Sequence, residues 1–450
     1  MERNFDVVVV GSGSAGTQAA LTLRERGKSV AVIDEAPFGG TCALRGCDPK
    51  KVLVHAARVV DAAQRLADIG VVNGAPAISW PDLLRFKRTF TDPVPQQRLQ
   101  SYDGAGIVAL RGQARFVDED ALRVEGDLLR AGHVVIASGA HEMHVAQGDD
   151  ILYTSETFMD LERMPRSLLF VGGGYIAFEF AHVAARAGAQ VTILNNDAHP
   201  LAGFDADIVR QLLDASRAAG ITIHLETPVV SVERDADGIV ARATQNGQTR
   251  AFRADAGVLA AGRTPNLEAL ALDAAGIERT KKGVKVNEFL QSTSNARVYA
   301  AGDAADSGGL PLTPIAAYTG EIAAQNLLSG NTRAPNFAGL ATMVYTIPPL
   351  GSVGLNQAQA RERGIDVDVS AGEMTDWYST RQVAGRAACF KTVREKRTGK
   401  ILGATVLGPH AEDQINVLAL AIRHGLDAKS VADSLFAYPT GASDVEYMLR

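Results

Sequence analysis

Two stretches of this 450-residue chain share one pattern, and this repeat constrains the fold more than any other feature. Residues 5–35 and 167–197 each contain an apolar run, a glycine-rich turn, an alanine-rich segment of helical length, a glycine and a second apolar run. Continuous apolar runs are typical of strands that are buried on both faces of a parallel sheet. The repeat therefore predicts two β–α–β units, one in each of two α/β domains.

The glycines in both turns have the spacing of a dinucleotide-binding loop. They are Gly11, Gly13 and Gly16 in the first copy, and Gly172, Gly174 and Ala177 in the second. In such loops the first glycine makes the turn, the second lets backbone amides approach a pyrophosphate, and the third packs helix on strand. One glycine triplet is weak evidence, but two copies in register favour two Rossmann-like domains and two dinucleotides.

Polar residues stand at the end of the second apolar run in each copy, and at the ends of two further apolar runs. Asp34 and Asn195 each lie 23 residues after the first glycine of their copy, near the ~20 expected for the residue that binds ribose hydroxyls. One further apolar run ends at Ser138 and Gly139, and another is followed by Asp303, which adjoins a glycine. A carboxylate at Asp303 can accept hydrogen bonds from a polyol chain such as ribitol. The alternative for Asp303 is a helix N-cap.

Cys42 and Cys47 lie five residues apart, shortly after the first β–α–β unit. Their spacing is wider than the C-x-x-C of thioredoxin-like or zinc sites, and no second Cys/His cluster follows to complete a metal site. Three cysteines in the chain cannot form a disulfide framework of the secreted kind, so a catalytic disulfide is favoured. A helix starting at Thr41 would bring both sulfurs onto one face and lower their pKa at its N-terminus. Cys389 is expected to be buried.

Charge and hydropathy exclude two classes of partner. The chain has 45 Lys+Arg and 51 Asp+Glu, a net charge of −6, whereas nucleic-acid binding needs a basic face. No apolar run approaches the roughly 18 residues of a membrane span. Residues 1–6, MERNFD, lack the apolar stretch of a secretion signal. We therefore expect a cytoplasmic protein that binds neither nucleic acid nor membrane.

Seven segments carry a resemblance to a known family. They are residues 39–51 (GGTCALRGCDPKK), 172–179 (GGGYIAFE), 260–266 (AAGRTPN), 298–304 (VYAAGDA), 310–320 (LPLTPIAAYTG), 347–355 (IPPLGSVGL) and 437–444 (AYPTGASD). Their order and spacing resemble the flavoprotein disulfide reductases, which include glutathione reductase, dihydrolipoamide dehydrogenase and mercuric reductase. The resemblance implies two Rossmann-like domains, a C-terminal α+β dimerisation domain, FAD, a nicotinamide cofactor and a homodimer.

The resemblance also implies roles for individual residues. Cys42 would attack the substrate disulfide, and Cys47 would be the thiol nearest the flavin. Lys50 would lie beside the flavin N5 and pair with Glu179, which fits because a cation there stabilises the reduced flavin anion. Tyr175 would cover the flavin until the nicotinamide displaces it.

Other positions of the same motifs are predicted to contact a cofactor or the partner subunit. Thr313 would place its backbone near the flavin ring, and cofactor contacts are also predicted for Thr41, Gly262 and Arg263. The segment from Tyr438 to Asp444 would reach into the active site of the partner subunit.

This C-terminal segment departs from the family pattern. The usual catalytic base is a histidine in an HPT motif, oriented by a glutamate five residues on. Here Tyr438 replaces the histidine, Ser443 occupies the glutamate position and Asp444 is next to it. A tyrosine titrates near pH 10, so it is a poor base at neutral pH but a usable acid. Tyr438 and Asp444 are therefore candidate catalytic residues, with interface packing as the alternative for Tyr438.

Three further departures bear on the substrate. Mercuric reductases pass the metal through a C-terminal cysteine pair, but no cysteine follows Cys389. Leu21 stands where glutathione reductases carry an arginine for the substrate carboxylate. Arg45 and Asp48 bracket Cys47, where relatives commonly have apolar residues. Arg45 either depresses a thiolate pKa or meets an anionic substrate, or it forms an ion pair with Asp48.

The residues after the second repeat bear on the choice of nicotinamide. Relatives that bind NADPH carry arginines here for the 2′-phosphate, and relatives that bind NADH carry a glutamate at the strand end. This chain has Asn195, Asn196, Asp197 and, after an alanine, His199. Asn195 can bond a ribose hydroxyl and Asp197 would repel a phosphate, while a neutral His199 is a weak phosphate contact. NADH is favoured over NADPH.

The predicted division has four parts and one leading function. Residues 1–147 and 261–335 would bind FAD, 148–260 the nicotinamide, and 336–450 would form the dimer interface. The predicted reaction passes electrons from NAD(P)H through FAD and a Cys42–Cys47 disulfide to a small disulfide substrate. One alternative is a diaphorase that reduces quinones or metal ions, and another is a redox-sensing binding protein.

Overall fold

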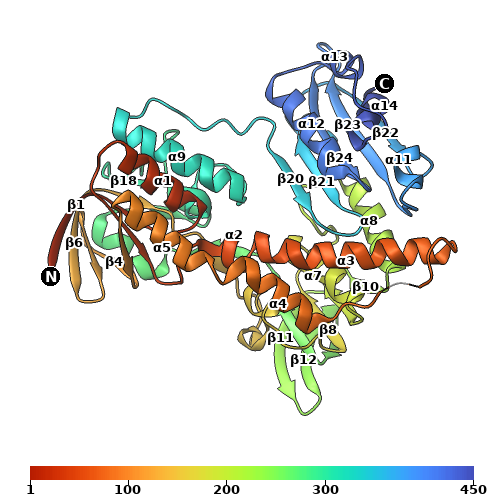
Figure 1. Cartoon of the computed structure of the whole chain (residues 1–450), viewed down its shortest axis with the longest axis horizontal. Coiled ribbons are helices and arrows are strands. Elements are labelled where there is room, and N and C mark those ends of the chain that lie inside the picture. The colour runs from red at the N-terminus through yellow and green to blue at the C-terminus, as the bar shows by residue number, and fades with distance from the viewer. Residues whose placement is uncertain (75) are drawn as a thin grey trace. The chain divides into compact units, whose positions relative to one another are not determined.

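The computed structural model describes residues 1–74 and 76–450, which form two compact units (Figure 1). Unit 1 consists of Met1–Lys50, Arg85–Met143 and Gly262–Asn336, and unit 2 of Lys51–Leu84, His144–Ala261 and Phe337–Arg450. Residues 51–84, which we expected in the FAD-binding part, thus belong to unit 2. The four-part division remains a prediction.

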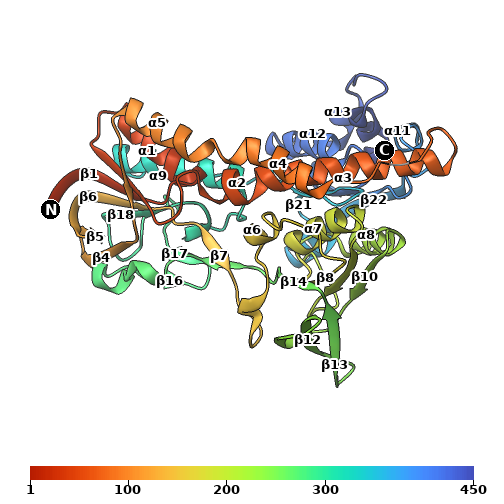
Figure 2. The ribbon, with the colours of Figure 1, turned by 60° about the horizontal axis from the view of Figure 1, so that its bottom comes forward.

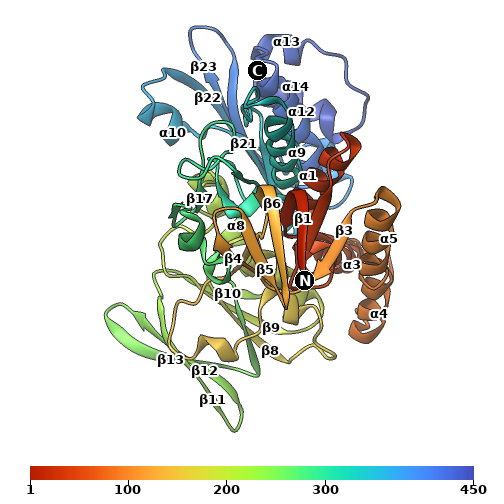
Figure 3. The same ribbon diagram turned by 90° about the vertical axis from the view of Figure 1, so that its left-hand side faces the viewer.

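A seven-stranded sheet with the order β3-β2-β1-β6-β5-β4 forms the core of unit 1, and β18 also pairs with β6 (Figure 3). Val7–Val10 pairs in parallel with Val30–Ile33 on one side and with His133–Ile136 on the other. The first predicted β–α–β unit is therefore present. The strands are β1 (Glu2–Val10), β2 (Val30–Asp34), β3 (Val108–Arg111), β4 (Ala114–Asp118), β5 (Ala121–Val124), β6 (Asp127–Ile136) and β18 (Val298–Ala300).

Two helices of unit 1 lie side by side against this sheet: α1 (Ser14–Glu25) and α9 (Thr313–Ser329) (Figure 1). Their close approach depends on Gly320 of α9. A Cβ added at Gly320 would lie 2.2 Å from the carbonyl oxygen of Ala15. The approach matters for the site because α1 follows the glycine-rich loop and α9 begins at Thr313.

Gly320→Ala is expected to lower the free energy of unfolding by about 1–3 kcal/mol, because the added methyl group overpacks the contact between α1 and α9. The matched control is Gly104→Ala in α5 (Val94–Ala105), where no described atom lies within 4 Å of an added Cβ. That change is expected to be neutral or to stabilise by about 0.5–1 kcal/mol. Urea unfolding measures both, and equal midpoints for the two variants would contradict the packing argument.

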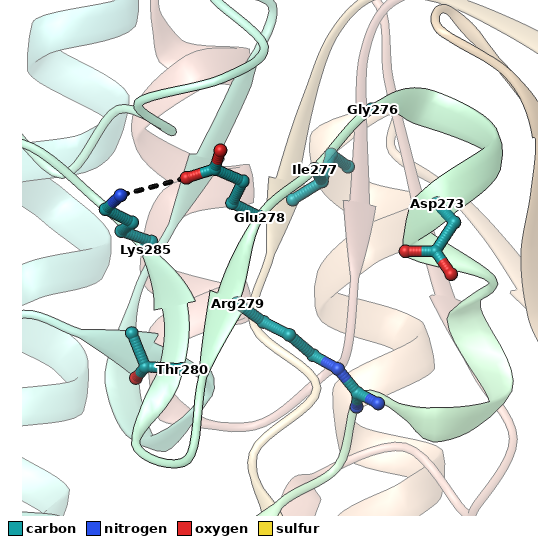
Figure 4. A pocket seen from close by; sticks show the side chains of 7 residues that line it. All are labelled: Asp273, Gly276, Ile277, Glu278, Arg279, Thr280 and Lys285. Carbon is teal, nitrogen blue, oxygen red and sulfur yellow. Dashed lines mark hydrogen bonds and ion pairs between the residues drawn. The ribbon is translucent and has the colours of Figure 1, made fainter.

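Short sheets and 3₁₀ turns complete unit 1. They are β7 (Ala140–Glu142) with β15 (Arg263–Pro265), β16 (Arg279–Thr280) with β17 (Gly283–Lys285) and β19 (Ala305–Asp306), and the turns η2 (Glu268–Leu270), η3 (Leu272–Ala275) and η4 (Gly302–Ala304). A hollow of about 590 Å³ lies beside the β16–β17 hairpin, where Lys285 pairs with Glu278 at 2.9 Å (Figure 4). None of its lining residues is a predicted site residue.

Unit 2 contains the second predicted β–α–β unit in a parallel sheet with the order β10-β9-β8-β14. An antiparallel sheet β11-β12-β13 extends from the same part of the unit (Figure 2). The strands are β8 (Ser167–Val171), β9 (Gln190–Leu194), β10 (Ile221–His224), β11 (Val229–Asp235), β12 (Gly238–Gln245), β13 (Gln248–Ala254) and β14 (Ala256–Leu259). The helical elements are η1 (Asp149–Ile151), α6 (Ser155–Phe158), α7 (Tyr175–Arg186) and α8 (Ala206–Ala218).

The C-terminal part of unit 2 is a five-stranded antiparallel sheet, β20-β21-β24-β23-β22, on which α12 packs. Its strands are β20 (Ala341–Val344), β21 (Leu350–Gly354), β22 (Val367–Glu373), β23 (Cys389–Glu395) and β24 (Ile401–Leu407). Its helical elements are α10 (Gln357–Glu362), α11 (Tyr378–Arg381), α12 (Ala411–Arg423), α13 (Ala428–Ala432), η5 (Gly441–Asp444) and α14 (Val445–Leu449).

Three helices remain: α2 (Gly40–Arg45) in unit 1, and α3 (Cys47–Asp68) and α4 (Trp80–Thr91), which each run from one unit into the other. The predicted fold class, two Rossmann-like α/β domains with a C-terminal α+β domain, is confirmed. Among residues 1–74 and 76–450, no helix is long and apolar enough to span a membrane.

Candidate active site

The two cysteines of the GGTCALRGCDPKK segment lie on different helices. Cys42 is the third residue of α2, and Cys47 is the first residue of α3. Gly46 separates the helices, and its carbonyl oxygen accepts the Lys50 amide at 3.2 Å in the first turn of α3. We predicted one helix starting at Thr41 with both sulfurs on one face, and this is wrong because the chain breaks at Gly46.

Both sulfurs have polar neighbours within unit 1. The Cys47 Sγ lies 3.4 Å from the Thr313 hydroxyl, at the first turn of α9. The Cys42 thiol donates to the Asp48 carboxylate at 3.7 Å. Cys47 is exposed and Cys42 is half-buried, and the two are not joined by a disulfide.

The environments of the two sulfurs differ. Hydrogen bonding to Cys47 and burial raise the pKa of the Cys42 thiol above its usual range, and the negative charge of Asp48 adds to this effect. The predicted lowering by a helix N-terminus is therefore wrong for Cys42. Cys47 sits where the N-termini of α3 and α9 meet, and helix N-termini stabilise nearby negative charge. The arrangement favours a thiolate on Cys47 over a thiolate on Cys42.

The first glycine-rich loop has the form that a bound pyrophosphate requires. Gly13 is the N-cap of α1 and, in the described chain, no side chain caps this helix, so its first amides are open to an anion. A Cβ at Gly16 would lie 1.9 Å from the Gly11 carbonyl oxygen, so the loop accepts only glycine there. The backbone amide and the hydroxyl of Ser12 donate to Asp34 at 2.8 and 2.6 Å. Asp34 therefore holds the loop and still has lone pairs for a ribose hydroxyl.

The other predicted flavin contacts also fit a polar ligand. Asp303 lies in η4, and burial raises the pKa of its carboxyl, while Arg263 opposes this shift. The Ser138 hydroxyl is buried at the end of β6 and has no hydrogen-bond partner among the described residues, so it is available to a ligand. Gly139 and Gly262 both have positive φ angles, and Arg263 bonds Glu142 at 3.2 Å.

The second glycine-rich loop repeats this form in unit 2. Gly174 is the N-cap of α7, again without a side-chain cap in the part of the chain that the structure describes, and Gly172 has a φ of 115°. Asn195 is buried, and its amide nitrogen donates to the Asp197 carbonyl at 2.7 Å. A Cβ at Gly173 would lie 2.3 Å from the Asn195 Oδ1. Asn195 thus supports the loop from inside, whereas Asn196 is exposed.

Glu179 on α7 is the centre of a buried polar cluster. Only 1% of Glu179 is exposed, and its carboxylate accepts the Lys51 ammonium at 2.7 Å and the Tyr345 amide at 2.9 Å. The Lys51 ammonium also lies 4.1 Å from the centre of the Tyr345 ring. Sequence reasoning missed Lys51 and Tyr345, although the consecutive lysines gave a signal for Lys51. Lys50 is the last residue of unit 1, so its pairing with Glu179 stays a prediction.

Tyr175 is the first residue of α7 and is half-buried in unit 2. Its hydroxyl lies 2.8 Å from the Thr342 hydroxyl, and its ring centre lies 5.6 Å from that of Phe204. Burial raises the pKa of Tyr175. Its predicted cover over the flavin stays a prediction.

The C-terminal segment presents its two candidate residues differently. Tyr438 is 76% exposed, and its ring centre lies 6.1 Å from that of Tyr378. Asp444 is buried, and its carboxylate accepts the Ser379 hydroxyl at 2.5 Å and the Gln414 amide at 3.2 Å. Burial raises the pKa of Asp444. Two donors of its own domain therefore hold the Asp444 carboxylate, and its catalytic role stays a prediction.

Comparison with known proteins shows the family of this chain. Residues 5–320 match the pyridine nucleotide-disulphide oxidoreductase family, and residues 340–449 match the dimerisation domain of that family. The chain belongs to this family. Its members are FAD-dependent and use pyridine nucleotides, and the dimerisation domain indicates a homodimer. The predicted resemblance is confirmed.

Several relatives match over nearly the whole chain. A glutathione reductase of Burkholderia cepacia is 30% identical, covering 98% of this chain and 97% of that protein. A mercuric reductase of Staphylococcus aureus is 29% identical, covering 98% of this chain and 81% of that protein. Among solved structures, the copper(II) complex of the HOCl-induced flavoprotein disulfide reductase RclA from Escherichia coli superimposes with a TM-score of 0.87 and 26% identity, covering 99% of each chain.

Proposed function

We propose that this enzyme uses NAD(P)H to reduce a small disulfide through FAD and the Cys42–Cys47 pair. The observation that carries the proposal is the placement of Cys47 between the N-termini of α3 and α9, with Cys42 as its neighbouring thiol. Both sulfurs belong to the unit that contains the first dinucleotide loop. A pair of this kind stores two electrons and passes them on by thiol–disulfide exchange.

Different residues of the chain bind the cofactors and react with the substrate. The open amides at the starts of α1 and α7 bind the two pyrophosphates. Bound FAD supplies the two-electron carrier between the nicotinamide and the cysteines. Cys42 attacks one sulfur of the substrate and releases the first thiol, and Cys47 then attacks the Cys42 sulfur and releases the second. The resulting Cys42–Cys47 disulfide is reduced again in the next turnover.

The surroundings of the second loop support NADH as the reductant. The Glu226 amide donates to the Asp197 carbonyl at 3.2 Å, so the segment after β10 brings a second acidic residue to this turn. Both side chains are exposed. Two carboxylates near the ribose site would repel the 2′-phosphate of NADPH.

Steady-state assays of the FAD-loaded enzyme test this function. We expect a yellow protein that oxidises NADH in the presence of at least one small disulfide from a panel of cystine-like, glutathione-like and hydroxyalkyl disulfides. We also expect a higher kcat/KM with NADH than with NADPH. A protein that stays colourless with added FAD, or that reduces no disulfide in the panel, would contradict the proposal. A tenfold preference for NADPH would overturn the argument from Asp197 and Glu226.

A second candidate is reduction of a metal ion, because relatives at similar identity include a mercuric reductase and the RclA structure contains copper(II). Among the residues that the structure describes, no cluster of three or more His, Cys, Asp or Glu side chains could hold a metal ion. Binding of the metal ion would then depend on the sulfurs of Cys42 and Cys47. NADH oxidation driven by Hg²⁺ or Cu²⁺ that exceeds every disulfide rate would favour this candidate.

Tyr438→Phe is expected to slow disulfide turnover by about tenfold or more, because general acid catalysis contributes roughly 10²–10⁴-fold. The proposal places the exposed Tyr438 near the partner subunit's Cys42, where its hydroxyl would hold the substrate sulfur or protonate the second thiolate, which Cys47 releases. Stopped-flow measurement of flavin reduction by NADH is the internal control and should be unchanged. Tyr378→Phe is the matched control for the neighbouring ring. If Tyr438→Phe turns over disulfide like the parent, Tyr438 only packs the interface.

A further inference from the structure

Asp48 is placed to exchange a proton with the reactive thiol. It is the second residue of α3, and its Oδ1 accepts the Cys42 thiol at 3.7 Å. Asp48 is exposed, so its carboxylate is accessible from solvent. Cys42, Cys47 and Asp48 all belong to unit 1, so their geometry is fixed within one compact body.

Three groups of unit 1, among the residues that the structure describes, act on the Cys42 thiol. They are the sulfur of Cys47, the carboxylate of Asp48 and the hydroxyl of Thr313. The Thr313 hydroxyl does not ionise near neutral pH. Cys47 has to act later as the nucleophile that resolves the mixed disulfide. Of these three groups, Asp48 is therefore the ionisable oxygen base that has no other part in the exchange.

The chain also needs such a group. Tyr438 occupies the position of the family's usual histidine base, so this chain has no imidazole at that position to accept a thiol proton. We propose that Asp48 is a catalytic residue that takes the Cys42 proton as Cys42 attacks the substrate and returns that proton to the leaving thiolate. The inference rests on the proposed disulfide reductase function and adds a residue to it.

The Cys42 S–H bond breaks and its proton moves to the Asp48 carboxylate, while the Cys42 sulfur forms a bond to one substrate sulfur. The substrate S–S bond breaks, and the leaving thiolate takes the proton from Asp48 to become a thiol. Cys47, as a thiolate whose proton has already passed to solvent, then attacks Cys42 and forms the Cys42–Cys47 disulfide. The second substrate thiolate is released and takes a proton from Tyr438 or from solvent. The two cysteines are oxidised by two electrons, and the substrate is reduced by two electrons.

Transfer through Asp48 is feasible because the donor and the final acceptor are both thiols. A carboxylate is a weak base toward a thiol, but the proton stays on Asp48 only while the S–S bonds exchange. The effect of Asp48 should therefore grow with the basicity of the leaving thiolate. If Asp48 acted only through its charge, the opposite result would be expected. The negative charge of Asp48 raises the pKa of the Cys42 thiol, so removing that charge would speed the exchange.

The test measures a single exchange on the FAD-loaded protein with Cys47→Ser and Cys389→Ser, so that Cys42 is the one remaining thiol. Two probes are compared: bis(2-hydroxyethyl) disulfide, whose leaving thiolate is strongly basic, and an aromatic nitrobenzoate disulfide, whose leaving thiolate is stable at neutral pH. We expect Asp48→Asn to slow the first reaction at least tenfold and to leave the second equal or faster. Asp48→Glu should keep most of the rate, because the carboxylate remains.

Asp103→Asn is the matched control, since it removes an exposed carboxylate of unit 1 from α5. It should leave both rates unchanged. Rates for Asp48→Asn that are equal to or faster than the parent with both probes would overturn the proposal. An equal loss with both probes would also overturn it, because it would mean a disturbed Cys42 rather than a lost proton carrier. If the intact enzyme turns over no disulfide but the probe dependence holds, the proposed function fails and the role of Asp48 stands.

Discussion

Cys42→Ser is expected to lower disulfide turnover by at least about 10³-fold, because a serine hydroxyl cannot replace the attacking sulfur. Cys47→Ser is expected to lose turnover to a similar degree for a different reason, since the mixed disulfide on Cys42 can no longer be resolved. The two variants separate in the absorbance of the resting enzyme. Cys42→Ser should keep the long-wavelength charge-transfer band between the Cys47 thiolate and oxidised flavin, because Cys47 remains beside the start of α9. Cys47→Ser should lose this band.

Cys389→Ser is the matched control for this pair. Cys389 begins β23 and is buried, and burial raises the pKa of its thiol to about 12, so we do not expect it to act as a nucleophile near neutral pH. This variant should keep disulfide turnover. If Cys42→Ser retained full turnover while Cys389→Ser lost it, the assignment of the attacking sulfur would be wrong.

The parts of the site that sequence predicted well are those that local chemistry determines. Glycines at fixed spacing produce the two loops, because a Cβ at Gly11 or Gly16 would collide with backbone carbonyl oxygens. The polar residue at the end of each second strand follows from the alternation of strand and helix. Asp34 and Asn195 therefore lie against their loops, where the spacing placed them.

The parts that sequence did not predict depend on packing between distant segments. The break at Gly46 gives each cysteine its own helix, and no local pattern distinguished it from one longer helix. Lys51 contacts Glu179 because α3 packs on α7. The two residues are 128 positions apart in the sequence. Asp444 is buried because Ser379 and Gln414 come from other elements of the C-terminal domain. A sequence motif names such residues but does not show which way their side chains face.

The largest loss of stability is expected from Glu179→Leu. The substitution leaves the Lys51 ammonium and the Tyr345 amide without the carboxylate that they share, and breaking a buried ion pair costs roughly 3–5 kcal/mol. Lys51 is 32% exposed, so water relieves part of this cost and about 3 kcal/mol is expected. Glu179→Gln keeps a hydrogen-bond acceptor for the amide and should lose less.

Denaturant unfolding followed by tryptophan fluorescence measures this loss where it occurs, because both tryptophans, Trp80 and Trp377, belong to unit 2 together with Glu179. Asp214→Asn is the matched control: it removes a carboxylate of unit 2 from an exposed pair with Arg217, which is worth about 0–1 kcal/mol. A loss for Glu179→Leu no larger than for Asp214→Asn would mean that the cluster does not hold α3, α7 and β20 together. The ion pair between Lys51 and Glu179 would then contribute no more to stability than an exposed surface pair does.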